Sequence, residues 1–402
     1  MLASLVAQTP DEPRYRQRMA RTHSAGLGAL YGMNHRYAES EEAMRAALAI
    51  LEPLAGEYPD STEYRQDLAN CYNNLGIVYY ETNRLDRAET AHGDALKIRA
   101  RLADAPSDTP LNRHRLAGSH NNLGMVYRES GRHAQAEKSF QLALDVWRRL
   151  TTEDPDNLDY QDAKALCCQN LGWLYFDYLG QPTKSEAAYQ EALQVREKLA
   201  REHSALVDNR SNLAIIYGQL ARVYGKLGQS AKTEAAYLKV LEIVESLART
   251  RPDAPRYRDD LADAYHRLAW YHQSAGRLEQ AESYYEKALP LRKQLADGDQ
   301  RVTKYQRMLA QLHHERGMLY TEGKRFPEAV QAYQEAIQVR EKLAQLSPSN
   351  APLLEDLAWS YHNLGNTFEA SGQPEKAEEV RAKALAIRER LARENPKMKD
   401  KR

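Results

Sequence analysis

One segment of this 402-residue sequence recurs at a fixed spacing of 48 residues. Residues 73–79 read NNLGIVY and residues 121–127 read NNLGMVY, and each segment is followed by a turn and then by an alanine-rich stretch. Self-similarity at such a period is typical of repeat architectures, in which each unit is one supersecondary element that packs on its neighbours. The repeat therefore constrains the fold before any other feature is considered.

Each unit carries a small residue in its first half, which we number position 8. Position 8 is glycine or alanine throughout: Gly28, Gly76, Gly124, Gly172, Ala221, Ala269, Gly317 and Gly365. The spacing is 48 residues except for one step of 49, because a residue is inserted before Gly180. The units fill nearly the whole chain.

The residue pattern within a unit predicts two helices that pack closely. Leu75, Gly76 and Tyr79 lie on one helical face, and small residues recur at positions 20 and 27 with an aromatic ring at position 24 in most units. Glycine within a helix costs about 1 kcal/mol relative to alanine, so its recurrence at position 8 indicates close approach of two backbones. Glycine at position 15 predicts a left-handed turn between the helices in four units: Gly131, Gly228, Gly276 and Gly372.

This pattern of small, aromatic and alanine positions resembles the tetratricopeptide repeat. The resemblance implies an all-α fold, an α-solenoid in which about eight antiparallel helix hairpins form a right-handed superhelix. The usual unit has about 34 residues, so the longer unit here predicts helices of about five turns. The unit resembles the long repeats of kinesin light chains and, still more, the 48-residue arrays attached to bacterial serine/threonine kinases.

The expected domain organisation is a single array over residues 1–402. Its repeats are expected at residues 11–58, 59–106, 107–154, 155–203, 204–251, 252–299, 300–347 and 348–395, followed by a basic tail at 396–402. Residues 4–16 align with residues 246–258, so residues 2–9 are expected to be the end of a second helix and the chain to begin inside a repeat of a longer parent.

The composition argues against several classes of partner. The 56 basic residues equal the 56 acidic residues, so no global basic field exists for nucleic acid or an anionic membrane. No run of about 18 apolar residues is present to span a bilayer. The three cysteines, Cys71, Cys167 and Cys168, form no disulfide framework and predict a reducing, cytoplasmic compartment.

The sequence offers no catalytic motif, and we expect a protein that is not an enzyme and has no cofactor. The glycines at 26, 28 and 32 miss the dinucleotide-binding spacing, and the segment from Gly317 to Arg325 lacks the spacing and hydroxyl of a phosphate-binding loop. His266, His314 and His362 recur at position 5 on successive helices, roughly 9 Å or more apart, which is too far to share a metal. They are expected to be polar surface groups.

Basic residues recur near the ends of the expected second helices: Arg99, Arg148, Arg149, Arg196, Arg292, Arg340 and Arg388. We interpret them as complementing the negative end of the helix dipole, with a designed anion site as the alternative.

The resemblance implies that partners bind in the concave groove lined by the first helices, around positions 2, 5, 6, 9, 12 and 13. The candidate partner-binding residues are Asn73, Asn74, Asn121, Asn122, Asn170, Trp173, His266, Arg267, Trp270, His314, His362 and Asn363. Asparagine can pair with both N–H and C=O groups of an extended peptide, and large side chains at position 9 offer apolar contacts. Alternatively, the asparagines tie adjacent helices together and the tryptophans fill the groove wall. Amide-rich repeats 2–4 and charged repeats 5–7 would fit two sub-sites or one long ligand.

The leading functional hypothesis is a non-catalytic scaffold that binds a peptide or partner protein. A second hypothesis is the regulatory or sensor region of a larger bacterial serine/threonine kinase. A third is a self-assembling array, based on apolar Leu385, Ile387 and Leu391 on the last helix with no helix to cover them.

Overall fold

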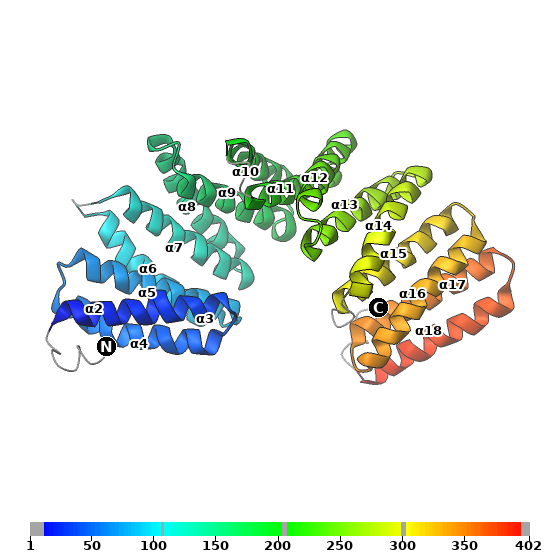
Figure 1. The fold of residues 1–402 in the computed structure, drawn as a ribbon, viewed down its shortest axis with the longest axis horizontal. Coiled ribbons are helices and arrows are strands. Elements are labelled where there is room, and N and C mark those ends of the chain that lie inside the picture. Colours follow the sequence, from blue (N-terminus) through cyan, green and yellow to red (C-terminus); the bar gives the residue numbers. More distant parts are fainter. Residues whose placement is uncertain (1–11, 106–107, 203–206, 299–302, 395–402) are drawn as a thin grey trace. The chain divides into compact units, whose positions relative to one another are not determined.

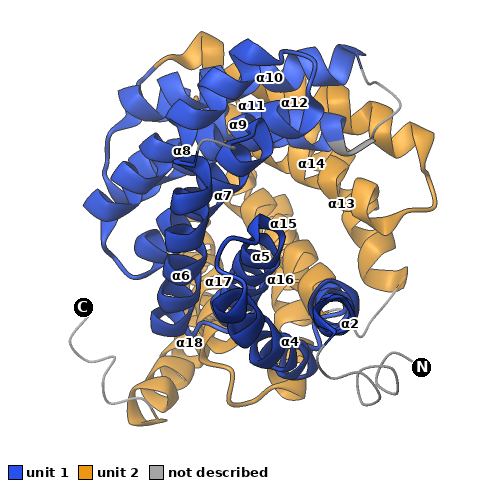
Figure 2. Ribbon diagram, turned by 90° about the vertical axis from the view of Figure 1, so that its left-hand side faces the viewer, with its two compact units in different colours: residues 1–228 blue, residues 229–402 orange. Residues whose placement is uncertain are grey.

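The computed structural model describes residues 12–105, 108–202, 207–298 and 303–394, which are helical apart from short turns and contain no strand (Figure 1). The chain divides into two compact units, Met1–Gly228 and Gln229–Arg402 (Figure 2). The division falls between the two helices of the fifth expected repeat. The expected helix over residues 2–9 and the basic tail at 396–402 lie outside the described residues.

Unit 1 is a succession of helix hairpins in which neighbouring helices along the chain pack on each other, from α2 to α11. Its first helices are α2 (Pro13–Arg21), continued by η1 (Thr22–Gly28) and α3 (Ala29–Met33), then α5 (Thr62–Glu81), α7 (Pro110–Glu129), α9 (Leu158–Trp173) with η2 (Leu174–Tyr178), and α11 (Val207–Lys226). Its second helices are α4 (Tyr37–Glu57), α6 (Leu85–Ala103), α8 (His133–Glu153) and α10 (Pro182–Glu202).

Unit 2 has the same arrangement. Its first helices are α13 (Pro255–Ser274), α15 (Thr303–Glu322) and α17 (Ala351–Ala370), and its second helices are α12 (Ser230–Thr250), α14 (Leu278–Gly298), α16 (Phe326–Leu346) and α18 (Pro374–Glu394). Helices α13 to α18 have 20 or 21 residues each, which is between five and six turns. The predicted all-α solenoid of long hairpins is confirmed, whereas the prediction of a single array over residues 1–402 stays a prediction.

The small residue at position 8 lets the two helices of a hairpin come together, as predicted. A Cβ atom added at Gly124 would lie 2.6 Å from Cε1 of Phe140, and one at Gly317 would lie 2.8 Å from the ring of Tyr333. Both rings occupy position 24 and are buried. In the last repeat Arg381 takes the place of the ring, and its Cγ would lie 2.7 Å from a Cβ atom added at Gly365.

The predicted left-handed turn is present in every repeat. Position 15 has a positive φ at Gly131, Gly180, Gly228, Gly276 and Gly372, and also at His35, Asn83 and Lys324. The next backbone N–H donates to the carbonyl of position 11, as from Arg132 to Tyr127 at 2.8 Å, which closes the helix end.

The inserted residue of the fourth repeat is absorbed within the helix. The end of its first helix is the π-helix η2 (Leu174–Tyr178), and a π-turn accommodates one extra residue without changing the register of the flanking turns. Gly180 keeps the positive φ of the other turns, at 61°. The 49-residue step in the sequence is therefore a local bulge, and the packing of the repeat is preserved.

Among the described helices, none combines the length and apolar character that crossing a bilayer requires. Cys71, Cys167 and Cys168 are buried as free thiols. Burial raises the pKa of the Cys71 and Cys168 thiols to about 12, so they pack as small apolar groups.

Candidate functional site

Large apolar side chains are exposed at two recurring positions of the first helices. Positions 2 and 9 are seven residues apart, which places them on one helical face that we call the first-helix face. In unit 1 it carries Ile77, Leu166 and Trp173, and in unit 2 it carries Trp270, Met318 and Trp359. Trp270 is 57% exposed and Trp359 is 52% exposed. Both lie within long helices, so fraying of a chain end does not explain their exposure.

The exposed tryptophans are held by polar neighbours on one side. The guanidinium of Arg128 lies 3.9 Å from the ring centroid of Trp173, and Arg128 itself is almost fully buried. Trp359 stacks on His362, with ring centroids 5.7 Å apart and an interplanar angle of 25°. The rings of Trp173 and Trp359 are therefore held in place by neighbouring side chains, while 40% and 52% of each residue stays exposed.

The asparagines at positions 5 and 6 connect successive first helices in unit 1. The side chain of Asn122 donates to Asn73 Oδ1 at 3.0 Å, and that of Asn170 donates to Asn121 Oδ1 at 3.1 Å. Position 6 thus donates to position 5 of the preceding repeat. This geometry supports the helix-tying alternative for these four residues, which we call the amide ladder.

The same register continues in unit 2 with other residue types. His266 contacts the carboxylate of Glu315, and the amide of Asn363 lies 3.2 Å from Nε2 of His314. His314 is 2% exposed, and burial lowers its pKa to about 3, so it is neutral at physiological pH. The expectation that His314 is a surface group is wrong, because it fills the space between two first helices.

The ladder leaves some candidate residues available. Position 5 of the first repeat is Ala25, which has no side-chain acceptor, so Asn74 has no hydrogen-bond partner among the described residues. Arg267 is exposed and pairs with Asp263 of its own helix at 2.6 Å, its one ion-pair partner within the described part of the chain. His362 is half-buried beside the exposed Trp359. Within the described part of the chain, no cluster of His, Cys, Asp and Glu could hold a metal ion.

The sequence analysis missed the role of the buried arginines, which clamp one repeat to the next. Arg99 on α6 donates to Ser119 Oγ at 2.7 Å and to the Arg115 carbonyl at 3.0 Å, both on α7, and to Asn70 Oδ1 at 3.0 Å on α5. Burial lowers the pKa of Arg99 to about 10, so it stays charged at neutral pH. One guanidinium therefore connects three helices.

Arg340 makes the corresponding contacts in unit 2, whereas two more buried arginines pair with an acid on the first helix of their own repeat. Arg340 donates to Ser360 Oγ and to the carbonyl of Asp356, whereas Arg196 and Arg292 pair with Asp162 and Asp259. The helix-dipole interpretation is wrong for these arginines, because they are buried and bind other helices. The sequence did contain one indication of this role: a serine follows the arginine by 20 residues in both cases, Ser119 after Arg99 and Ser360 after Arg340.

A family model described as tetratricopeptide repeat matches residues 18–101, 115–198, 212–294, 260–342 and 308–390. The chain belongs to the tetratricopeptide repeat family. The matched segments each span two repeats and together cover well over half of the sequence. No curated protein sequence matches this tetratricopeptide repeat chain.

Solved structures share the fold at low sequence identity. A signal transduction ATPase with numerous domains (STAND) with a tetratricopeptide repeat sensor, from Pyrococcus horikoshii, is 13% identical with a TM-score of 0.59, covering 98% of this chain and 52% of that one. BtubC from P. vanneervenii is 20% identical with a TM-score of 0.49, covering 64% of this chain and 91% of its own. At 13% identity, the Pyrococcus horikoshii structure shows that the fold is shared and nothing about function.

The amide ladder predicts different effects for two neighbouring asparagines of this tetratricopeptide repeat chain. Asn122→Ala removes a hydrogen bond between α5 and α7 and is expected to lower the free energy of unfolding by about 1 kcal/mol. Asn74→Ala removes no hydrogen bond within the described structure and is expected to leave stability unchanged. Chemical denaturation followed by circular dichroism compares the two variants. Equal destabilisation by both would contradict the ladder.

Proposed function

We propose that the chain is a non-catalytic scaffold that binds a peptide segment of a partner protein on its first-helix face. The observation that carries this proposal is the exposure of tryptophan and other large apolar side chains at positions 2 and 9. Trp270 and Trp359 each leave half or more of their surface in water. Exposed aromatic side chains that recur on one face are typical of interaction sites, where tryptophan contributes much of the binding energy.

The polar residues beside these side chains suit an extended backbone. In unit 1, Asn74 offers both a donor and an acceptor to a peptide, and its surroundings on α5 are uncharged. In unit 2, Arg267 and His362 lie beside the tryptophans and favour a segment that carries polar or acidic groups. A few hydrogen bonds of about 1 kcal/mol each, together with two apolar anchors, are consistent with affinity near 1 μM, about −8 kcal/mol.

The alternatives receive less support from the geometry. Self-assembly rested on three apolar residues of α18, but Leu391 belongs to the buried core of unit 2 and Ile387 packs against that core. Leu385 alone is exposed, at 57%. The hypothesis of a kinase sensor region stays a prediction that depends on a longer parent protein.

The proposal is tested with peptides selected from a random 12-residue display library on the full chain and then measured by fluorescence anisotropy. Truncation of a buried aromatic anchor costs 2 kcal/mol or more in typical interfaces, so Trp270→Ala or Trp173→Ala is expected to weaken the selected peptides by about tenfold or more. The matched control is Leu142→Ala on the second helix α8, where Leu142 is 43% exposed.

The thermal midpoint is expected to be the same for Trp270→Ala and Leu142→Ala, because both side chains are exposed. The proposal is contradicted if Leu142→Ala weakens peptide binding and neither tryptophan substitution changes it. That result would place the binding site on the second helices.

A further inference from the structure

A recurring contact closes the surface between successive second helices. In the third repeat Arg132 pairs with Glu89 of the preceding second helix at 2.6 Å, and its guanidinium lies 4.6 Å from the ring centroid of Tyr127. We call this combination the repeat lock. It consists of a cation after the turn, an aromatic ring at position 11 and a glutamate at position 21 of the preceding repeat.

The repeat lock recurs with the same geometry in both units. Arg84 pairs with Glu41 at 2.6 Å in unit 1, and Arg325 pairs with Glu282 at 2.7 Å in unit 2. Both guanidinium groups lie 4.6 Å from a tyrosine ring, that of Tyr79 or Tyr320. The lock therefore depends on three residues contributed by two repeats.

The fourth repeat keeps the lock with a different cation. Gln181 replaces the arginine at position 16, and Lys184 at position 19 takes over its role. The ammonium of Lys184 lies 3.4 Å from Glu137 and 5.1 Å from the ring centroid of Tyr175. A lysine at position 19 can thus complete the lock when a carboxylate is present on the preceding second helix.

The junction between the seventh and eighth repeats lacks that carboxylate. Gln373 and Lys376 occupy the same repeat positions as Gln181 and Lys184 of the fourth repeat. The position that Glu137 occupies on the preceding second helix is here occupied by Val330. Lys376 donates to Gln373 Oε1 at 2.7 Å and has no carboxylate partner among the described residues. The cation of the lock is present here without its anion.

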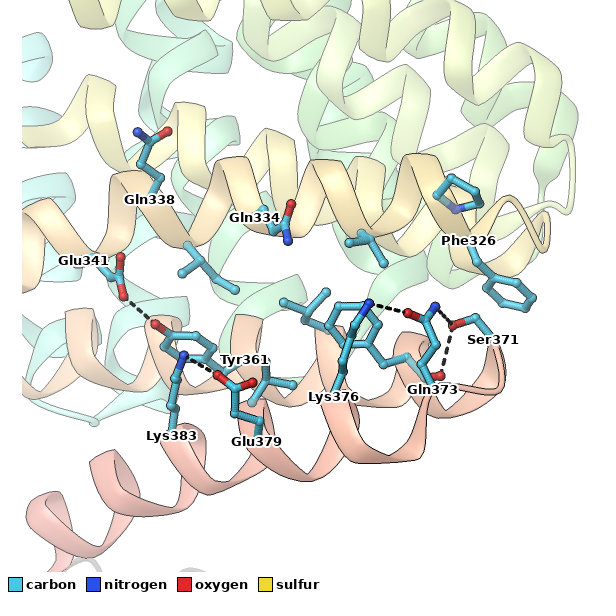
Figure 3. A pocket seen from close by; sticks show the side chains of 16 residues that line it. Phe326, Gln334, Gln338, Glu341, Tyr361, Ser371, Gln373, Lys376, Glu379 and Lys383 are labelled. Carbon is cyan, nitrogen blue, oxygen red and sulfur yellow. Dashed lines mark hydrogen bonds and ion pairs between the residues drawn. The ribbon is translucent and has the colours of Figure 1, made fainter.

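A cavity of about 860 Å³ opens at this position, between α16, α17 and α18 (Figure 3). Its floor is apolar and includes Val330, Ile337, Leu364, Phe368 and Val380. The ammonium of Lys376 lies at the rim, 5.6 Å from the ring centroid of Phe368. Ligand pockets in proteins are typically 300–1,000 Å³ and combine an apolar lining with a few polar groups, so this cavity has the size and lining of a binding site.

The cavity is separate from the first-helix face. On α17 its lining residues are Tyr361, Leu364 and Phe368, whereas Trp359 and His362 belong to the first-helix face. Trp359 and Tyr361 are two residues apart, which is roughly 200° around a helix. A ligand of the cavity therefore does not compete with a peptide on the first-helix face.

We propose that this cavity binds an acidic linear peptide, with a bulky apolar side chain on the floor and an Asp or Glu carboxylate paired with Lys376. The peptide carboxylate pairs with Lys376 in the way that the carboxylate of Glu137 pairs with Lys184 in the fourth repeat.

The cavity lining also carries Lys383, which pairs with Glu379, and Glu341, which accepts a hydrogen bond from Tyr361. Lys376 is therefore the lining cation that has no carboxylate partner among the described residues, and it selects an acidic occupant. The apolar floor selects a neighbouring leucine, methionine or aromatic side chain.

The probe is a random 12-residue display library selected on the full-length Trp270→Ala variant, with the enriched peptides labelled and measured by fluorescence anisotropy. The selected peptides are expected to place a bulky apolar residue within three positions of an Asp or Glu. Val330→Glu places a carboxylate beside Lys376 and is expected to weaken these peptides at least tenfold. Lys376→Gln, an exposed substitution that leaves the fold intact, is expected to weaken them by a similar factor, whereas Trp359→Ala leaves their affinity unchanged.

A peptide in which the acidic residue is replaced by its amide completes the test. This amide peptide is expected to bind the unsubstituted chain about tenfold more weakly than the acidic peptide does. For the Lys376→Gln variant, the two peptides are expected to have the same affinity. Absence of enriched peptides, or affinity that is indifferent to both Val330→Glu and Lys376→Gln, would overturn the proposal. A concentration-dependent dimer in light scattering that Val330→Glu abolishes would assign the cavity to a second copy of the chain instead.

Discussion

Arg340→Ala is expected to lower the free energy of unfolding by about 3 kcal/mol, because it leaves several buried polar groups without partners. Arg340 is 4% exposed and donates to the carbonyl of Asp356 at 2.7 Å, to Gln311 Oε1 at 3.0 Å and to Ser360 Oγ. The substitution also removes the packing of the aliphatic stem between α15 and α17. Guanidinium denaturation of the full chain, followed by circular dichroism, measures the change.

Arg388→Ala is the matched control for this prediction. Arg388 occupies the same repeat position on α18 as Arg340 does on α16, but it is only half-buried and lies 6.0 Å from the ring centroid of Trp359. Its removal is expected to change stability by less than about 0.5 kcal/mol. Similar losses for the two variants would show that the arginine at this position does not clamp repeats together.

Gly124→Ala and Gly118→Ala are expected to change stability in opposite directions, although both glycines lie on α7. A Cβ at Gly124 would lie 2.6 Å from the ring of Phe140, so the ring must move within a packed core, at a cost of about 1–3 kcal/mol. Nothing lies within 4 Å of a Cβ at Gly118, where alanine is expected to gain about 0.5–1 kcal/mol through helix propensity.

Thermal or chemical unfolding of these two variants gives the sign of each effect. A stabilising Gly124→Ala would mean that α7 and α8 do not approach as closely as the structure shows. A replacement of Phe140 by leucine in the Gly124→Ala background provides a further check, because the smaller side chain is expected to recover part of the loss.

The fold could be predicted from the sequence because its determinants are local and periodic. Gly124 and Phe140 are only 16 residues apart, and the same pair of positions recurs at a constant interval along the chain. The turn at position 15 was predicted from its glycines, whereas its left-handed conformation at His35 was not, because a positive φ is uncommon for any residue other than glycine.

The site could be predicted only in part, because its polar residues are used across repeats. The family resemblance placed Asn73 and Asn122 on the corresponding inner faces of successive first helices but left open whether they bind a ligand or each other. The role of Arg99 was missed, although Ser119 follows it by 20 residues, because its acceptors lie on two other helices and one of them is a backbone carbonyl. The cavity beside Lys376 was missed because its lining comes from three helices, and Val330 is only a single departure from the glutamate at that repeat position.

Site-specific photo-crosslinking tests the proposed first-helix face most directly. A benzophenone side chain is placed at Met318 on α15 or at Leu238 on α12, which are 38% and 42% exposed. The probe is a labelled peptide selected on the full chain whose binding requires Trp270. A crosslink from position 318 and none from position 238 is the predicted result; a crosslink from position 238 alone would contradict the account.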